Sequence, residues 1–344
     1  MKFREHLGRA GQLAAVACAG QVVSYAFYIV LARRTGVSEF EDYAVAVGAV
    51  TLLASFTTLG LEKYAVRILP VFYERGDWAG ARGYAGFALR RTLWTSIAAG
   101  AALALGWGWW DPGSASWAAV AVALLVLPVV SLAQLAVEVL TAGGHELRGI
   151  LLYRVGVPSA ALALVLLALE LPLAFSGAAA VACWGLGWGL ALAGMARALR
   201  RTTPSGVWAS SPRDEAGWQR EALPFLGYGL AMNFIGQAGV LGLELLGASE
   251  VDLGAYAAAA QTTGLVVVLA TATNRFYAPR LSLLIERGDF ASMENVRRQR
   301  MRWVLPLVAA FLVAALGFGR EILELFRPEF VEDGVPVQIG RAHV

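Results

Sequence analysis

Polar side chains recur at helical spacing within long apolar blocks, and their positions suggest chemistry inside a membrane. Residues three or four apart share one face of a helix, so each group forms a polar stripe. Lipid cannot hydrogen-bond to such groups, so a stripe must face other helices or water. The candidate lining residues are Gln21, Tyr25, Thr51, Ser55, Gln134, Asn233, Gln237, Thr263 and Asn274.

These stripes have two interpretations. A single Ser, Thr or Gln is most simply explained as a hydrogen bond between packed helices, worth about 0.6 kcal/mol. Stripes on several helices together instead favour a polar lumen between helical bundles. We expect such a lumen here, with the stripes on its wall.

Ionisable residues near the ends of the blocks extend this hypothesis. A charge at the bilayer centre costs about 2.5–3.5 kcal/mol, so Glu138 and Glu244 are candidates for binding a coupling proton or sodium ion. The alternative is that such side chains reach the membrane interface. The candidates for an inner, cationic site that attracts an anionic headgroup are Lys63, Arg67, Arg154, Arg275 and Arg280.

Signatures of soluble enzymes are missing from the sequence. It has no phosphate-binding glycine loop, no metal-ligand spacing and no nucleophile elbow. Cys18 and Cys183 both fall inside apolar blocks and indicate neither a disulfide framework nor a metal site. We therefore expect a transporter without catalytic residues, metal or cofactor.

The elements that position these residues follow from composition. Of 344 residues, 58% are hydrophobic and 15% charged, whereas soluble domains carry about 25% charged residues. Apolar blocks of about 20 residues match a helix that crosses the hydrocarbon core. The fold class is therefore an all-α, multi-pass membrane protein. We predict nine transmembrane helices, at about 10–32, 43–62, 92–110, 117–140, 150–170, 177–197, 222–246, 254–274 and 303–319.

The formal net charge of +3 does not indicate a nucleic-acid partner. Lys and Arg concentrate in alternate loops, which is the positive-inside bias that orients membrane helices. This pattern predicts a cytoplasmic N-terminus and cationic loops beside anionic lipid headgroups. The expected partner is therefore the lipid bilayer.

A weak internal repeat predicts two homologous halves. The segment at 38–44 (SEFEDYA) resembles 249–257 (SEVDLGAYA), and 74–78 (ERGDW) resembles 286–290 (ERGDF). Transporters are often built from such repeats, with the substrate path between them. The expected organisation is a six-helix lobe at 1–197, a cytoplasmic linker at 198–221 and a partial second lobe of three helices at 222–337.

The last seven residues, 338–344 (QIGRAHV), have a different explanation. Their codons can be written as the start of a widely used sequencing adapter, followed in frame by a stop codon. We expect that these residues are adapter read-through and that the second lobe is truncated there.

Several short motifs resemble Wzx-type polysaccharide flippases of the multidrug/oligosaccharidyl-lipid/polysaccharide exporter superfamily. The segment at 31–36 (LARRTG), followed by Glu39-Phe40 and Tyr43-Ala44, resembles their junction between helices 1 and 2. The segments 59–61 (LGL) and 74–77 (ERGD), and 326–330 (FRPEF) in the second half, are similar to later parts of the pattern.

The resemblance implies a protein of 12–14 helices in the bacterial inner membrane, with two six-helix lobes around a central cavity. Its implied function is flipping an undecaprenyl-diphosphate-linked oligosaccharide by alternating access, with other polysaccharide-assembly proteins as possible partners. Arginine suits a diphosphate because it binds phosphate oxygens in bidentate fashion.

Two other functions are considered. A cation-coupled multidrug exporter of the same superfamily usually has an acidic residue in helix 1, and 10–32 contains none, although Glu244 leaves this alternative open. A membrane-embedded glycosyltransferase or ligase needs catalytic carboxylates or histidine and a large outer loop, neither of which is evident.

Overall fold

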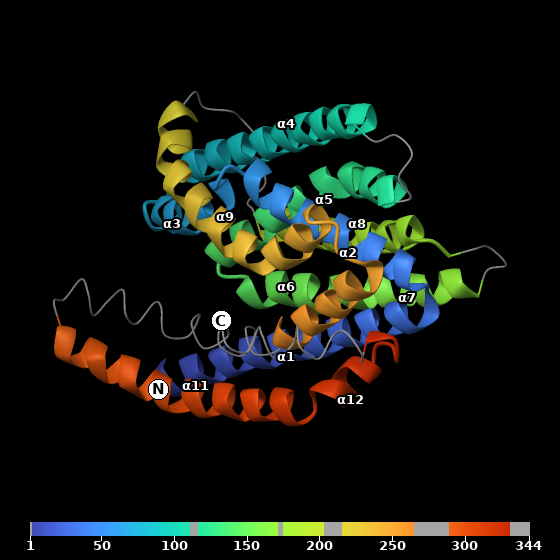
Figure 1. The fold of residues 1–344 in the computed structure, drawn as a ribbon. Helices are drawn as coiled ribbons and strands as arrows, with labels where there is room; N and C mark the ends of the chain where they lie inside the picture. The colour runs from blue at the N-terminus through green and yellow to red at the C-terminus, as the bar shows by residue number, and fades with distance from the viewer. Residues whose placement is uncertain (1, 111–115, 171–174, 203–214, 265–288, 331–344) are drawn as a thin grey trace.

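The protein is a bundle of long helices that lie side by side (Figure 1). The computed structural model describes residues 2–110, 116–170, 175–202, 215–264 and 289–330, and these contain helices and turns but no strand. The expected all-α, multi-pass fold is confirmed. The helices are α1 (Lys2–Arg34), α2 (Val37–Thr57), α3 (Leu61–Glu74), α4 (Trp78–Trp110), α5 (Ser116–Ala142), α6 (Glu146–Ile150), η1 (Leu151–Gly156), α7 (Val157–Leu169), α8 (Gly177–Thr202), α9 (Glu215–Leu245), α11 (Phe290–Gly317) and α12 (Gly319–Glu324).

Within the described residues, six helical stretches are long and apolar enough to cross a membrane. They are Ala15–Arg34, Val37–Thr57, Trp117–Ala142, Glu146–Leu169, Gly177–Arg201 and Glu215–Leu245. Each overlaps one of the nine expected blocks. The block at 92–110 lies in the 33-residue α4, and the last block contains a shorter apolar helix, Val304–Gly317. The block at 254–274 is described only to residue 264, where it is helical.

The predicted continuous helix at 43–62 is wrong. Helix α2 ends at Thr57, and α3 begins at Leu61 after a tight turn. Leu59 has φ 53° and Gly60 has φ 76°, a left-handed conformation that suits glycine and ends helices. The turn changes the direction of the chain, so Glu62 lies on a different helix from Thr51 and Ser55.

Two apolar clusters hold the bundle together. The larger joins α1, α2, α5, α7 and α8 and also includes Val240 of α9 and Phe330. The smaller lies where α3, α4 and α5 meet, and includes Tyr64 and Tyr84. Many large apolar side chains point outward, among them Leu125, which is 79% exposed. Such exposure is expected where helices face lipid.

Helix η1 is a π-helical segment between α6 and α7, and α1 packs against it. A Cβ added to Gly20 of α1 would lie 2.8 Å from Cβ of Arg154. Glycine therefore permits this close approach, and it places Arg154 at the contact between α1 and η1.

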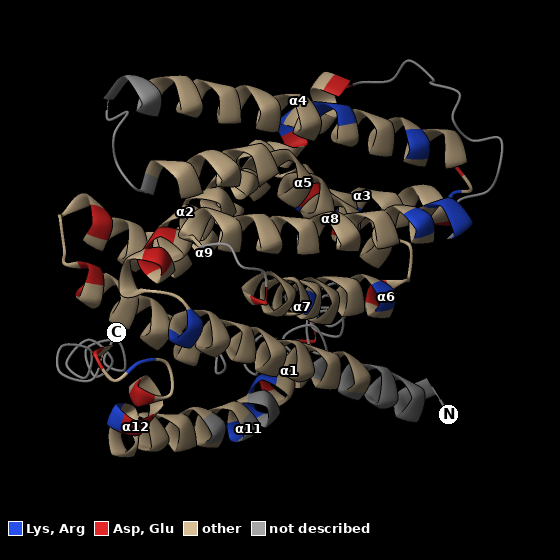
Figure 2. Cartoon of the chain, turned by 90° about the vertical axis from the view of Figure 1, so that its right-hand side faces the viewer, with Lys and Arg blue, Asp and Glu red and all other residues tan. Residues whose placement is uncertain are grey.

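Charges separate along the bundle (Figure 2). Asp and Glu gather where α2 begins and α9 ends, while many Lys and Arg lie toward the end that holds the N-terminus. This distribution agrees with the positive-inside pattern in the sequence. The cytoplasmic location of the N-terminus stays a prediction.

Helix α9, the first helix of the proposed second half, packs on the corner between α2 and α3. A Cβ on Gly60 would lie 2.5 Å from the backbone nitrogen of Leu226 and 3.1 Å from the carbonyl carbon of Phe225. Backbone therefore meets backbone here, and a side chain at residue 60 has no room.

We predict that Gly60→Ala destabilises the protein more than Gly76→Ala. Both glycines have positive φ, so alanine costs roughly 1–2 kcal/mol at either position. A Cβ at Gly76 meets nothing within 4 Å, whereas overpacking at Gly60 adds about 1–3 kcal/mol. Thermal unfolding in detergent, followed by Trp fluorescence, measures the difference. Equal unfolding midpoints for the two variants would contradict the packing described for α9.

Candidate functional site

An ion pair and a buried carboxyl group lie side by side at the start of α3. The Lys63 ammonium donates a hydrogen bond to Glu138 Oε1 on α5. The Lys63 side chain is 38% exposed and that of Glu138 is 12% exposed. Glu138, one of the two expected coupling carboxylates, is thus already neutralised by Lys63, one of the expected headgroup ligands.

Glu62 precedes Lys63 and is more deeply buried, at 5% exposed. Its Oε2 atom has no hydrogen-bond partner among the described residues. Burial raises the pKa of the Glu62 carboxyl, and the Thr58 hydroxyl and the Lys63 ammonium offset only part of that rise. A buried carboxylate with an unpaired oxygen is costly, so burial shifts the Glu62 equilibrium toward its protonated form.

The first turns of α9 close the same region. The Tyr64 hydroxyl donates a hydrogen bond of 2.5 Å to Glu221 Oε2. Trp218 contacts the rings of Phe72, Tyr84 and Phe87 with centroid distances of 6.5, 5.5 and 5.8 Å. We call this set of contacts, between α9 and the α3–α4 pair, the inner junction, after the side of the membrane that the sequence predicts for it.

Four of the nine expected lining residues make local hydrogen bonds. Thr51, Ser55, Asn233 and Thr263 each donate to a backbone carbonyl one turn earlier in their own helix, at 2.7, 3.3, 3.0 and 3.1 Å. Gln134 is half-buried on α5. These bonds give each hydroxyl group and the Asn233 amide nitrogen a partner without water, so the polar lumen stays a prediction.

Three of the expected lining residues lie at contacts between the two halves. The Tyr25 hydroxyl is 3.2 Å from the Thr262 hydroxyl. A Cβ on Gly264 would lie 3.2 Å from Gln21 Nε2, and a Cβ on Gly48 would lie 3.2 Å from Gln237 Oε1. The structure thus brings Gln21 and Tyr25 to the helix at 250–264, and Gln237 to α2. Asn274 lies outside the described residues.

The expected headgroup residues are only partly described. Arg67 is exposed on α3. The Arg154 guanidinium lies 4.9 Å from the ring centroid of its neighbour Tyr153, a distance typical of a cation–π contact. Arg275 and Arg280 lie outside the described residues. A shared cationic site therefore stays a prediction.

Glu244, the second expected coupling carboxylate, lies at the other end of α9. Its carboxyl group is within hydrogen-bonding reach of Glu41, and its charge also acts on Asp42 of α2. This places Glu244 in an acidic group on two helices that belong to different halves.

The segment of the second half at 324–330 contacts the α1–α2 junction. Arg33 Nε donates to the Leu325 carbonyl at 2.7 Å, and Arg327 donates to the Thr35 carbonyl at 2.9 Å. The ring centroids of Phe40 and Phe330 lie 6.0 Å apart. The halves therefore contact each other at this end as well as at the inner junction.

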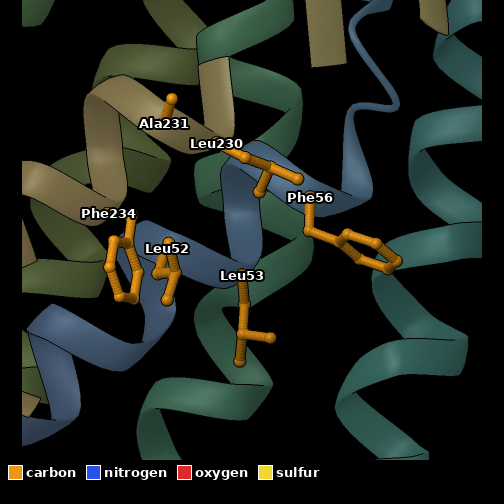
Figure 3. Close-up of a pocket in the computed structure, with 6 residues that line it drawn as sticks. All are labelled: Leu52, Leu53, Phe56, Leu230, Ala231 and Phe234. Atoms are coloured by element: carbon orange, nitrogen blue, oxygen red, sulfur yellow. The ribbon is translucent and has the colours of Figure 1, made fainter. Parts of the chain in front are cut away.

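An apolar cavity of about 470 Å³ opens between α2 and α9. Figure 3 shows the six side chains that line it, with Leu52 and Phe234 next to one another. Phe56 and Phe234 are 48% and 58% exposed. A cavity with this lining suits the apolar part of a ligand. Its lining residues are Leu52, Leu53, Phe56, Leu230, Ala231 and Phe234.

Sequence reasoning missed the inner junction and this cavity. Trp218 and Glu221 fall within the predicted linker at 198–221, whereas α9 begins at Glu215. One available signal was the aromatic Trp218 within an otherwise polar stretch. The apolar cavity residues are indistinguishable in sequence from residues that face lipid, because both are apolar side chains in membrane helices.

We predict a larger coupling energy for Lys63–Glu138 than for the Arg90–Glu215 pair, whose side chains are 59% and 53% exposed. The mostly buried Glu138 should give a coupling of about 1 kcal/mol, after allowance for solvent around Lys63, and the exposed pair less than about 0.5 kcal/mol. Double-mutant cycles with Lys63→Met and Glu138→Gln, and with Arg90→Met and Glu215→Gln, measure both from unfolding. A larger coupling energy for Arg90–Glu215 than for Lys63–Glu138 would contradict this prediction.

Comparison with known proteins gives a match in structure only. No protein family and no curated protein matches the sequence. Among solved structures, the chain is similar to a multidrug resistance MATE family transporter of the MOP superfamily in its inward-facing conformation, with TM-score 0.67 and 14% identity, over 96% of this chain and 74% of that chain. The outward-facing conformation of such a transporter gives TM-score 0.68 and 14% identity, over 96% of this chain and 76% of that chain.

A MOP superfamily transporter from Pyrococcus furiosus, described as having a binding pocket of reverse polarity, gives TM-score 0.65 and 13% identity over 97% of this chain and 76% of that chain. At such low identity, the likeness defines the arrangement of the helices and not the cargo. The chain therefore has the helical fold of MATE transporters of the MOP superfamily.

Proposed function

We propose that this chain works as an alternating-access membrane exporter of amphipathic molecules. The observation that carries the proposal is the apolar cavity between α2 and α9, located where the first half meets the second, in a chain with the fold of MATE transporters. An apolar part of a cargo molecule gains about 25 cal/mol for each Å² removed from water.

Both conformations of such transporters support the same proposal. The chain matches an inward-facing and an outward-facing structure almost equally well, at TM-scores of 0.67 and 0.68. In alternating access, the contacts between halves break at one end while those at the other end form. In this chain, the inner junction and the Arg33 and Arg327 contacts are the two sets that exchange.

Flipping of a lipid-linked oligosaccharide is the second candidate. Exposed Arg67 on α3 favours it, because an arginine accessible from the membrane surface can bind a diphosphate. The sequence resemblance to Wzx-type flippases points the same way. Against it, Lys63 of the expected headgroup set is already bound to Glu138. The bacterial inner membrane is the proposed location for either cargo.

The transport test uses the purified chain in liposomes and a counterflow assay, which needs no assumed driving force. We predict that a lipophilic fluorescent cation exchanges across the membrane, and that Ala231→Trp slows the exchange about tenfold, because indole fills the cavity. Ala216→Trp is the matched control, since Ala216 is exposed on the same helix but does not line the cavity.

Movement of a lipid-linked oligosaccharide in the same liposomes, without exchange of the cation, would select the second candidate. Equal counterflow rates for Ala231→Trp and Ala216→Trp would show that the cavity is not part of the cargo path. Transport of neither cargo by folded protein would overturn the proposed function.

A further inference from the structure

Glu62 is a buried ionisable group that the proposed cargo path does not use. It lies on α3, 5% exposed, with Oε2 unpaired among the described residues. Its other oxygen faces α9, because a Cβ on Gly229 would lie 3.8 Å from Oε1. The carboxyl group thus lies against the helix whose first turns form the inner junction.

The groups around Glu62 come from each element packed against α3. Lys63 follows it on α3, Glu138 faces it from α5, and Tyr84 faces it from α4. Lys63 binds Glu138, and the Tyr84 hydroxyl donates to the Leu61 carbonyl at 2.6 Å. On α9, Glu221 accepts from Tyr64. The Thr58 hydroxyl donates to the Ser55 carbonyl at 3.0 Å and stabilises the Glu62 charge only in part. Among the described residues, the nearby cation and the tyrosine donors are committed to other acceptors.

The charge of Glu62 is consequently poorly compensated while α9 is in place. A buried carboxylate with an unpaired oxygen avoids its desolvation cost by taking a proton or by gaining access to water. Because α9 covers the carboxyl group, departure of α9 from α3 would admit water. Protonation and the position of α9 are therefore thermodynamically linked.

We propose that Glu62 is a proton-binding site whose occupancy holds α9 against α3 and so keeps the inner junction closed. The inference rests on the proposed function only in that α9 must move relative to α3 during transport. The pKa of Glu62 is raised in the closed arrangement, so closure is favoured at low pH and is lost as the pH rises through that raised pKa.

The test measures the α3–α9 distance with spin labels at Val66→Cys and Leu223→Cys, two exposed positions, after replacement of Cys18 and Cys183. We expect the ratio of closed to open populations to fall by up to about tenfold per pH unit between the closed-state and open-state pKa values. Glu62→Gln should keep the short distance at every pH. Glu170→Gln, which removes an exposed carboxyl group, should behave like the parent protein.

An infrared titration checks the proton directly. The difference between the parent protein and Glu62→Gln should contain a protonated carboxyl band that disappears over the same pH range as the short distance. An unchanged pH dependence in Glu62→Gln would overturn the proposal, as would a Glu62 that is ionised throughout.

These outcomes are separable from failure of the proposed function. If the α3–α9 distance depends on pH through Glu62 but the chain moves neither test cargo, the proton site stands and the transport proposal falls. If the chain transports cargo while the α3–α9 distance does not change with pH, the transport proposal stands and the proton site falls.

Discussion

The close contact between α9 and the corner joining α2 to α3 is the constraint on which the other features of this protein depend. Gly60 makes that contact possible, because its left-handed backbone turns the chain and its missing side chain lets the backbone of α9 approach. The contact places Glu62 beneath α9 and brings Trp218 among the aromatic rings of α3 and α4. Further along α2 and α9, beyond this contact, lies the apolar cavity between the two helices.

The membrane supplies the second constraint, which explains why so many polar side chains make local bonds. Thr51, Ser55 and Asn233 donate to their own helix backbone, and such bonds survive any rearrangement of the helices. Among the described residues, the interactions between halves include hydrogen bonds from Arg33 and Arg327 to backbone carbonyls, and aromatic contacts. They also include the Tyr64–Glu221 and Tyr25–Thr262 hydrogen bonds and the exposed Arg90–Glu215 pair. Contacts of this kind can break at one end of the bundle and form at the other without leaving many buried groups unpaired.

The apolar blocks predicted the helices well because a run of about 20 apolar residues has few alternatives to a membrane helix. The break before Leu61 was not predicted, since Thr58 and Leu59 do not interrupt the hydropathy of the block. Only Gly60 signalled a turn. Partners in the candidate site were inaccessible for another reason: Lys63 and Glu138 are 75 residues apart, and Tyr64 and Glu221 are 157 apart. Pairing at such separations depends on how helices pack, which helical periodicity does not encode.

If α2 and α9 separate while cargo passes, a covalent link between them must stop transport. Gly48 and Gln237 approach each other across the two helices, since a Cβ on Gly48 would lie 3.2 Å from Gln237 Oε1. In a protein lacking Cys18 and Cys183, cysteines at both positions can be joined by a short, reducible bis-methanethiosulfonate linker. We expect linking to stop counterflow and reduction to restore it, whereas either single cysteine treated in the same way has no such effect. Full transport with the link completely formed would show that α2 and α9 do not separate.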